Sequence, residues 1–315
     1  MKNVFITGIT GFVGFHLAER LVREGKNVTG LTHDWQKDTY FDVFPPLLSK
    51  LNVVTGDVCN RGLIERILAQ YKIDTVFHLA ARSTVLEAHF SPLPVFETNI
   101  MGTATVLEAC RNTGLPNSIL VMSTDKVYGE GMSADEDMPL KGLGIYESSK
   151  VAVDQIARSY AYVYDMPITV ARCCNIYGLD FKRRIVPNVI RTILEGKAPI
   201  IYREPNPSTR EYIYVDDAVD ALIFLAENIN EARGKAWNMG TGDVMNQEEL
   251  IIEIMHLAGC DLEPIYQDKV RGKEILRQSV NSTRIQKLGW EPKVSLREGL
   301  KRAIKDMEGY YERGF

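Results

Sequence analysis

A tyrosine and a lysine at helical spacing carry the clearest chemistry in this chain. Tyr146 and Lys150 lie four residues apart at the start of a segment with helical periodicity, so both side chains project from one face of the predicted helix. A positive neighbour favours the phenolate, which predicts a lowered pKa for Tyr146. The pair is therefore a candidate general base that removes a hydroxyl proton. The alternative is an exposed tyrosine and lysine on a solvated helix, a common outcome of this spacing.

Three polar residues follow the apolar run 119–122, which predicts a buried parallel strand. Thr124, Asp125 and Lys126 leave that strand at its carboxyl end, where open α/β sheets bind ligands. We expect both ionisable side chains to face inward, where they offer an acid and a base on adjacent residues. A surface ion pair is the alternative for this carboxylate and lysine.

A glycine-rich turn joins the first predicted strand, 3–7, to a helix that ends near residue 24. Gly8 permits the tight turn, Gly11 lets the backbone approach a pyrophosphate, and Gly14 lets the helix lie close to the sheet. A helix N-terminus then faces the anion. The residues predicted to contact a dinucleotide here are Gly8, Thr10, Gly11, Phe12, Val13 and Gly14.

Strands and helices that alternate along the chain must position these groups. The pattern predicts an α/β fold, a Rossmann-type doubly wound parallel sheet with a smaller, discontinuous carboxyl-terminal lobe. Asp34, beyond the second strand, is predicted to accept hydrogen bonds from the adenosine ribose, which favours NAD over NADP. Asp57 and Val58 follow the third strand and are predicted to contact adenine. A helix N-cap is the alternative role for Asp57.

The fourth predicted strand, 75–78, opens into small residues that let the backbone pass beneath a flat cofactor ring. Leu79, Ala80 and Ala81 are the predicted contacts. A long helix is predicted from Phe96 to about Thr113, and its Asn99 is expected to support the loops beside the cofactor.

Composition limits the class of partner. The 315 residues are 45% hydrophobic with a net charge of -4, which gives no basic surface for nucleic acid or anionic lipid. No apolar run is long enough to cross a bilayer, and the first residues enter a strand without a leader pattern. The five cysteines form no C-x-x-C pair, which favours reduced thiols in the cytoplasm, and the scattered histidines predict no metal site.

The motifs together resemble the extended short-chain dehydrogenase/reductase superfamily, in its nucleotide-sugar epimerase and dehydratase group. The resemblance rests on Thr7-Gly8-x-x-Gly11-x-x-Gly14, Gly56-Asp57, His78-Leu79-Ala80-Ala81, Asn99, Ser123-Thr124, Tyr146-x-x-x-Lys150, Arg172-x-x-Asn175-x-Tyr177-Gly178 and Arg210-Glu211-Tyr212-x-Tyr214-Val215-Asp216-Asp217. Thr124-Asp125-Lys126 is similar to the Thr-Asp-Lys of CDP-glucose 4,6-dehydratase, and the amino-terminal run is similar to the GDP-mannose and CDP-glucose dehydratases.

The resemblance implies a 4,6-dehydratase that uses NAD as the hydride carrier. Tyr146 would remove the C4 hydroxyl proton, Thr124 would bind the forming carbonyl, Lys126 would take the C5 proton, and Asp125 would protonate the departing C6 hydroxyl. The alternative is a 4-epimerase, which needs only Thr124, Tyr146 and Lys150. A more remote alternative is a non-catalytic NAD-binding regulator. Two features depart from the dehydratases: the chain is short, and an acid, Glu147, directly follows Tyr146.

The resemblance also implies a cleft for a nucleotide-diphosphate sugar between two lobes. The predicted boundaries are 1–175 plus 213–239 for the NAD(P)-binding domain and 176–212 plus 240–315 for the nucleotide-sugar lobe. A homodimer is expected through the helices that start near residues 98 and 146. The predicted substrate contacts are Arg82, Thr124, Asn175, Arg184, Val186, Asn188, Arg210 and Arg271.

Overall fold

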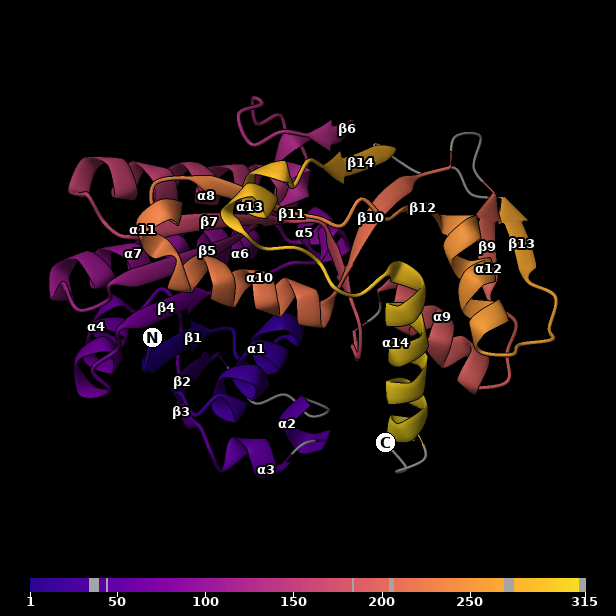
Figure 1. Cartoon of the computed structure of the whole chain (residues 1–315), viewed down its shortest axis with the longest axis horizontal. Coiled ribbons are helices and arrows are strands. Elements are labelled where there is room, and N and C mark those ends of the chain that lie inside the picture. Colours follow the sequence, from indigo (N-terminus) through magenta and orange to yellow (C-terminus); the bar gives the residue numbers. More distant parts are fainter. Residues whose placement is uncertain (34–39, 44, 183, 204–206, 269–274, 312–315) are drawn as a thin grey trace.

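The computed structural model describes residues 1–33, 40–43, 45–182, 184–203, 207–268 and 275–311. Its centre is a seven-stranded sheet, in which every described pairing is parallel, with helices on both faces (Figure 1). In spatial order the strands are β11 (Ala236–Met239), β7 (Ile168–Cys173), β5 (Ser118–Thr124), β4 (Thr75–His78), β1 (Asn3–Thr7), β2 (Asn27–Thr32) and β3 (Asn52–Thr55). The predicted doubly wound Rossmann-type sheet is confirmed.

Burial on both faces explains why the inner strands are nearly continuous apolar runs. One face is covered by α4 (Arg61–Gln70), α7 (Gly102–Thr113) and α8 (Ile145–Tyr164), and the other by α1 (Phe12–Arg23) and α10 (Val215–Glu227). Two apolar clusters fill the space between the sheet and these layers. The carboxyl ends of the strands therefore stay rigid, which is what a site at that edge requires.

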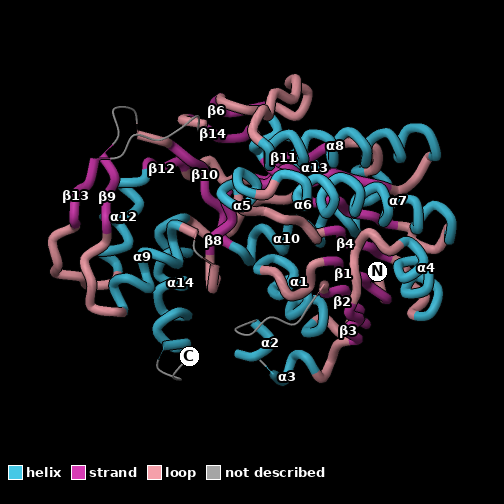
Figure 2. Tube along the Cα trace, turned by 180° about the vertical axis from the view of Figure 1, so that it is seen from behind, coloured by secondary structure: helices cyan, strands magenta, loops and turns pink. Residues whose placement is uncertain are grey.

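The second half of the chain builds a smaller body beside this sheet (Figure 2). Its strands are β12 (Val244–Asn246), β10 (Thr209–Tyr214), β14 (Arg277–Val280), β8 (Asn175–Tyr177) and the pair β9 (Ile200–Arg203) and β13 (Ile265–Asp268). Its helices α9 (Ile185–Leu194), α12 (Gln247–Leu257) and α14 (Leu296–Tyr311) pack on one another. The predicted domain boundaries stay a prediction, and β6 (Gly131–Ala134) pairs across them with β14.

The predicted long helix from Phe96 to about Thr113 is present, but it is not α-helical throughout. The segment comprises α6 (Pro92–Phe96), a π-helical turn (Glu97–Met101) and then α7. A π turn inserts a residue into the helical register and often marks a functional site. The remaining short elements are α2 (Tyr40–Val43), α3 (Pro45–Leu48), α5 (Val85–Phe90), a 3-10 turn (Asp125–Tyr128), α11 (Ile229–Ala232) and α13 (Thr283–Leu288). Along the described residues, no helix has both the length and the apolar character needed to span a membrane.

Candidate active site

The glycine turn after β1 leaves no room for larger residues. Gly8 has a φ of +74°, and a β-carbon added there would lie 2.9 Å from the Ala80 Cα, while one added to Gly14 would overlap the Gly8 carbonyl. Gly11 is the N-cap of α1 and offers no side chain to the free N–H groups of the first turn. Those donors, together with the helix dipole, suit the pyrophosphate of a dinucleotide. The turn therefore fits NAD as predicted from its spacing.

A hydrogen-bonded histidine lies directly behind this turn. The backbone N–H groups of Leu79 and Ala80 both donate to Thr7 Oγ1, at 3.1 Å each. The Thr7 hydroxyl hydrogen is then left for His78 Nδ1, 2.8 Å away, so the proton of the neutral ring sits on Nε2 and is donated to Thr103 Oγ1 at 2.9 Å. Burial lowers the pKa of His78 to about 3. The ring is thus neutral and fully hydrogen-bonded.

Asn99, presented by the π turn, links two loops of the site. Its Oδ1 accepts from the Arg82 N–H at 2.8 Å, while Nδ2 donates to the Arg82 carbonyl at 3.2 Å and to Ser149 Oγ at 2.9 Å. Ser149 Oγ in turn donates to the Tyr146 carbonyl at 2.7 Å. Asn99 thus supports the loop after β4, the role predicted for it, and joins that loop to the start of α8.

Tyr146 and Lys150 both lie on the buried side of α8. Burial, and next the negative charge of Asp125, raise the pKa of Tyr146, while Arg184 only partly opposes them. Lys150 Nζ donates to the Met122 carbonyl at 2.8 Å, and burial lowers its pKa to about 8. The predicted lowering of the Tyr146 pKa is therefore wrong for the protein chain by itself, because desolvation of the phenol outweighs the attraction of nearby cations.

The polar residues after β5 form a short hydrogen-bonded set. Thr124 Oγ1 donates to Asp125 Oδ1 at 2.8 Å, and Lys126 Nζ lies 3.4 Å from the same oxygen and 3.2 Å from Asn175 Oδ1. Asp125 is fully buried, and its Oδ2 has no hydrogen-bond partner in the described part of the chain. Of the two ionisable groups only Lys126 lines the cavity, so the expectation that both face into the site is wrong for Asp125. The side chain of Asp125, which begins the 3-10 turn, is fully buried and is not part of the cavity lining.

A cavity of about 1530 Å³ separates the strand ends from the smaller body. The predicted site residues that line it are Lys126, Tyr146, Asn175, Arg184, Val186, Asn188 and Arg210. Thr124 and Arg82 are not among the lining residues, and the predicted contacts Asp34 and Arg271 lie outside the described residues. No cluster of three or more candidate metal ligands occurs within the described ranges.

Two of the arginines predicted to contact the substrate already have protein partners. Arg184 pairs with Asp180, and its guanidinium lies 5.2 Å from the centre of the Phe12 ring. Arg210 Nη1 donates to the carbonyl oxygens of Thr209 and Leu276 at 3.0 Å each. Both arginines still line the cavity, so a diphosphate would share or exchange these contacts.

Asp57 does not cap the helix that follows it. The N-cap of α4 is Asn60, whose side chain accepts from the Leu63 N–H at 3.1 Å, while Asp57 Oδ1 accepts from the Cys59 N–H at 2.8 Å. The capping alternative for Asp57 is therefore wrong. Its carboxylate remains mostly exposed, and the adenine contacts proposed for Asp57 and Val58 stay predictions.

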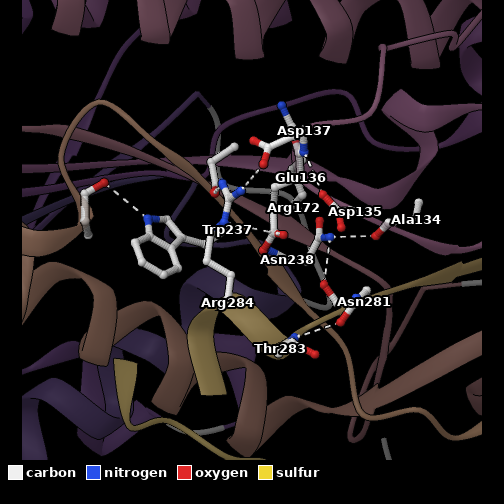
Figure 3. A network of polar contacts seen from close by, with 12 residues as sticks. Ala134, Asp135, Glu136, Asp137, Arg172, Trp237, Asn238, Asn281, Thr283 and Arg284 are labelled. Atoms are coloured by element: carbon white, nitrogen blue, oxygen red, sulfur yellow. Dashed lines mark hydrogen bonds and ion pairs between the residues drawn. The ribbon is translucent and has the colours of Figure 1, made fainter. Parts of the chain in front are cut away.

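A buried arginine ties the wall behind the cavity together (Figure 3). Arg172 donates through Nε and Nη2 to the Asp154 carboxylate at 2.7 and 2.8 Å, and through Nη1 to the Tyr128 hydroxyl and the Glu136 carbonyl. Asn238 N donates to Glu136 Oε1 at 3.0 Å. Strands β7 and β11, helix α8 and the loop after β6 are therefore locked to one another.

Comparisons with known proteins agree with this geometry. Residues 4–240 match the model of the NAD dependent epimerase/dehydratase family. The chain belongs to this family. This membership confirms the family predicted from the motifs and makes NAD its cofactor.

Relatives of both reaction types occur at similar distance. A putative UDP-glucose 4-epimerase of Methanocaldococcus jannaschii is 28% identical over 97% of this chain and 98% of its own length. The trifunctional enzyme RHM2 of Arabidopsis thaliana, whose activities include UDP-glucose 4,6-dehydratase, is 28% identical over 96% of this chain, which spans only 46% of that protein. The crystal structure of DesIV, a dTDP-glucose 4,6-dehydratase of Streptomyces venezuelae with NAD and TYD bound, has a TM-score of 0.89 at 26% identity and covers 100% of this chain and 98% of its own.

Several residues of the site were not found by sequence reasoning. His78 and Ser149 complete the hydrogen-bonded chain behind the glycine turn. Glu211 is fully buried and accepts from the N–H groups of Gly242 and Val280 at 2.7 Å each. His78 and Glu211 stand within motifs that carry the family resemblance, but no role was assigned to either, whereas nothing local distinguishes Ser149.

Proposed function

We propose that this enzyme is an NAD-dependent nucleotide-sugar 4,6-dehydratase. The observation that carries the proposal is the burial of Asp125, one of whose oxygens has no partner among the described residues. Its carboxylate lies beside Lys126, and its charge raises the pKa of the Tyr146 phenol. An unpaired buried carboxylate oxygen costs free energy, so its presence needs a functional explanation. Dehydration needs an acid at this place, whereas epimerisation at C4 does not.

The first half of the reaction uses the wall formed by β5 and α8. We propose that Tyr146 first loses its own proton to solvent and then, as the phenolate, takes the proton of the C4 hydroxyl. Thr124, whose hydroxyl hydrogen is donated to Asp125 in the chain by itself, turns it to the C4 oxygen as that oxygen becomes a carbonyl. NAD, when bound, supplies a hydride acceptor and later a hydride donor. Lys150 is held by the Met122 carbonyl, and Arg184 is a positive charge that favours the phenolate as it forms. Leu79, Ala80 and Ala81 remain the proposed backbone contacts beneath the cofactor.

The second half removes water across C5 and C6. A C4 carbonyl makes the C5 proton acidic, and the proposed base for it is Lys126 in its neutral form. Asp125 in its acid form donates a proton to the leaving C6 hydroxyl, so the C6–O bond breaks, a C5–C6 double bond forms and one water leaves. Return of a hydride to C6 and of a proton to C5 gives a 4-keto-6-deoxy sugar. The roles require Asp125 to turn toward the cavity that Lys126 already lines.

A 4-epimerase is the second candidate. The absence of Asp125 from the cavity lining favours it, as does the match of the chain to an epimerase of nearly the same length. Thr124, Tyr146 and Lys150 would suffice for that reaction. In it the 4-keto sugar presents its other face before reduction.

We propose that the cavity binds the nucleotide-diphosphate sugar across both bodies of the molecule. Asn175, which accepts from Lys126 and donates to the Glu211 carbonyl, would contact the sugar. Arg184 and Arg210 would bind the diphosphate, because guanidinium groups match its charge and geometry. The remaining lining residues proposed for substrate contact are Val186 and Asn188.

We also propose a homodimer through α7 and α8, which pack side by side (Figure 1). Tyr162 is 90% exposed and Val163 64% exposed on α8, and Met101 is 57% exposed just before α7. Apolar surface of this kind favours a partner of like surface. Light scattering during gel filtration tests the state, and a Tyr162→Glu variant should become monomeric.

The reaction is tested by incubating the purified protein with UDP-, dTDP-, GDP- and CDP-sugars and measuring product mass. Loss of one water supports the dehydratase, and an isomer of unchanged mass supports the epimerase. Asp125→Asn and Lys126→Met should each abolish water loss, as should Tyr146→Phe. If only Tyr146→Phe matters, the dehydratase proposal fails and the epimerase stands.

A further inference from the structure

Glu147 is a buried acid that the proposed reaction does not use. It directly follows Tyr146 in the first turn of α8 and is only 8% exposed. Its carboxylate lies over Gly144, where an added β-carbon would overlap Oε2, and its Cβ would meet a β-carbon added to Gly142 at 2.8 Å. The two glycines thus leave space for this one side chain.

One oxygen of this carboxylate is unpaired. Within the described residues, Glu147 Oε2 is buried and has no hydrogen-bond partner. The helix dipole stabilises a negative charge near the helix N-terminus. An exposed carboxylate would gain the same stabilisation without the free-energy cost of leaving water. A capping box is also excluded, because the N-cap residue Gly144 has no side chain that would complete it. Helix stability therefore does not explain why the group is buried.

The carboxylate shares a cavity with the proposed base. Glu147 and Tyr146 both line the space of about 1530 Å³, and the charge of Glu147 contributes to the raised pKa of Tyr146. Two of the cations that line this cavity contact other groups, since Lys126 contacts Asp125 and Asn175, and Arg184 pairs with Asp180. Oε2 itself is closed off over Gly144, so a ligand donor would meet this carboxylate on the side that lines the cavity.

We propose that Glu147 determines sugar specificity by accepting a hydrogen bond from a hydroxyl or N–H group of the sugar bound against Tyr146. An ionised carboxylate only accepts hydrogen bonds, so it binds a sugar that presents a hydrogen-bond donor and repels one that carries a second carboxylate. The enzyme therefore takes uncharged hexoses and rejects hexuronic acids. This inference rests on the proposed function and deepens it by naming the class of sugar.

The test measures binding in a Tyr146→Phe background, so that turnover does not alter the ligand. Calorimetry first identifies which of UDP-, dTDP-, CDP- and GDP-glucose binds most tightly. The affinity for that nucleotide sugar is then compared with the affinity for glucuronic acid on the same nucleotide. We expect the glucose form to bind at least tenfold more tightly. Adding Glu147→Gln, which keeps the shape and removes the charge, should reduce that preference roughly tenfold.

Glu130→Gln is the matched control, because Glu130 lines the same cavity as an exposed acid. It should leave the preference unchanged. Thermal unfolding checks the fold of each variant, and Glu147→Ala replaces Glu147→Gln if the latter unfolds. The inference is overturned if both sugars bind with equal affinity, if Glu147→Gln leaves the preference for glucose unchanged, or if Glu130→Gln reduces that preference equally. The proposed function stands in each of these cases. Failure of every nucleotide sugar to bind the chain overturns both.

Discussion

The two walls of the active site differ in how their buried polar groups are satisfied. Behind the glycine turn, a continuous chain of hydrogen bonds reaches the first turn of α8. It joins Thr7, His78, Thr103, Asn99 and Ser149 in that order. On the other wall, Asp125 and Glu147 each keep one buried oxygen that has no partner among the described residues. The first wall is complete by itself and holds its shape before any ligand binds. The second wall lacks donors, which a substrate can supply.

This difference separates two kinds of mutational effect. Changes in the completed wall should lower stability, because each leaves a buried donor or acceptor unpaired. Changes in the incomplete wall should lower activity at little cost in stability, as expected where function and stability compete.

The largest effect on activity is expected for Tyr146→Phe. Loss of the phenolic proton acceptor should reduce turnover by at least about 10³-fold, or about 4 kcal/mol in the barrier. Because burial already keeps this phenol neutral, the free energy of unfolding should change by less than about 1 kcal/mol. Product mass and urea unfolding check the two parts. A large loss of stability would contradict the proposed separation.

The next largest effect should come from Arg172→Met. The change removes the buried partner of Asp154, whose side chain is fully buried, and leaves only Arg158, at 3.9 Å, among the described residues, which should cost about 3 kcal/mol in the free energy of unfolding. Arg233→Met is the control, since its partner Asp165 is 91% exposed and such pairs contribute about 1 kcal/mol or less. Urea unfolding of both variants measures the difference, and equal losses would show that the Arg172 network does not lock the wall.

Acid should weaken the completed wall through His78. The pKa of this ring is about 3 in the folded chain and 6.5 in the unfolded one, so the unfolded state binds more protons between these values. Stability attributable to His78 should therefore fall as the pH drops below 6.5, by roughly 3 kcal/mol at pH 4. His78→Asn should flatten this dependence, and the exposed His89→Asn should not. A slope that survives His78→Asn would refute the assignment.

Asn99→Ala should cost about 2 kcal/mol in the free energy of unfolding. It removes the acceptor of the Arg82 N–H and the donor to both the Arg82 carbonyl and Ser149 Oγ. NAD affinity should weaken as well, because the loop after β4 loses its support. The control is Asn112→Ala, which removes an exposed contact to Glu65 and should change stability by less than about 0.5 kcal/mol. Denaturant unfolding and NAD titration test the pair.

The smallest effect on stability is expected for Asp125→Asn. Removing a buried charge that has an unpaired oxygen should leave the free energy of unfolding unchanged or raise it by about 1 kcal/mol. Thermal unfolding provides the measurement. A loss above about 1 kcal/mol would mean that Asp125 belongs to the completed wall.

Local patterns predicted the parts of the site that depend on short-range geometry. Gly8, Gly11 and Gly14 required only a strand, a turn and a helix, and the spacing of Tyr146 and Lys150 required only a helix face. Asn99 was placed correctly as a support, although the π turn that aims it was not foreseen. Its partners lie 17 and 50 residues away, and such contacts leave no local trace.

By itself the sequence determined the doubly wound sheet and the dinucleotide turn, because each follows from hydrophobic periodicity and residue spacing along a continuous stretch. The family followed from the resemblance of its motifs to a known superfamily. Only the tertiary structure decided the protonation chemistry. Desolvation depends on atoms brought together from distant segments, so burial reversed the shift predicted for Tyr146, folded Asp125 beneath the cavity and left Glu147 buried without a donor.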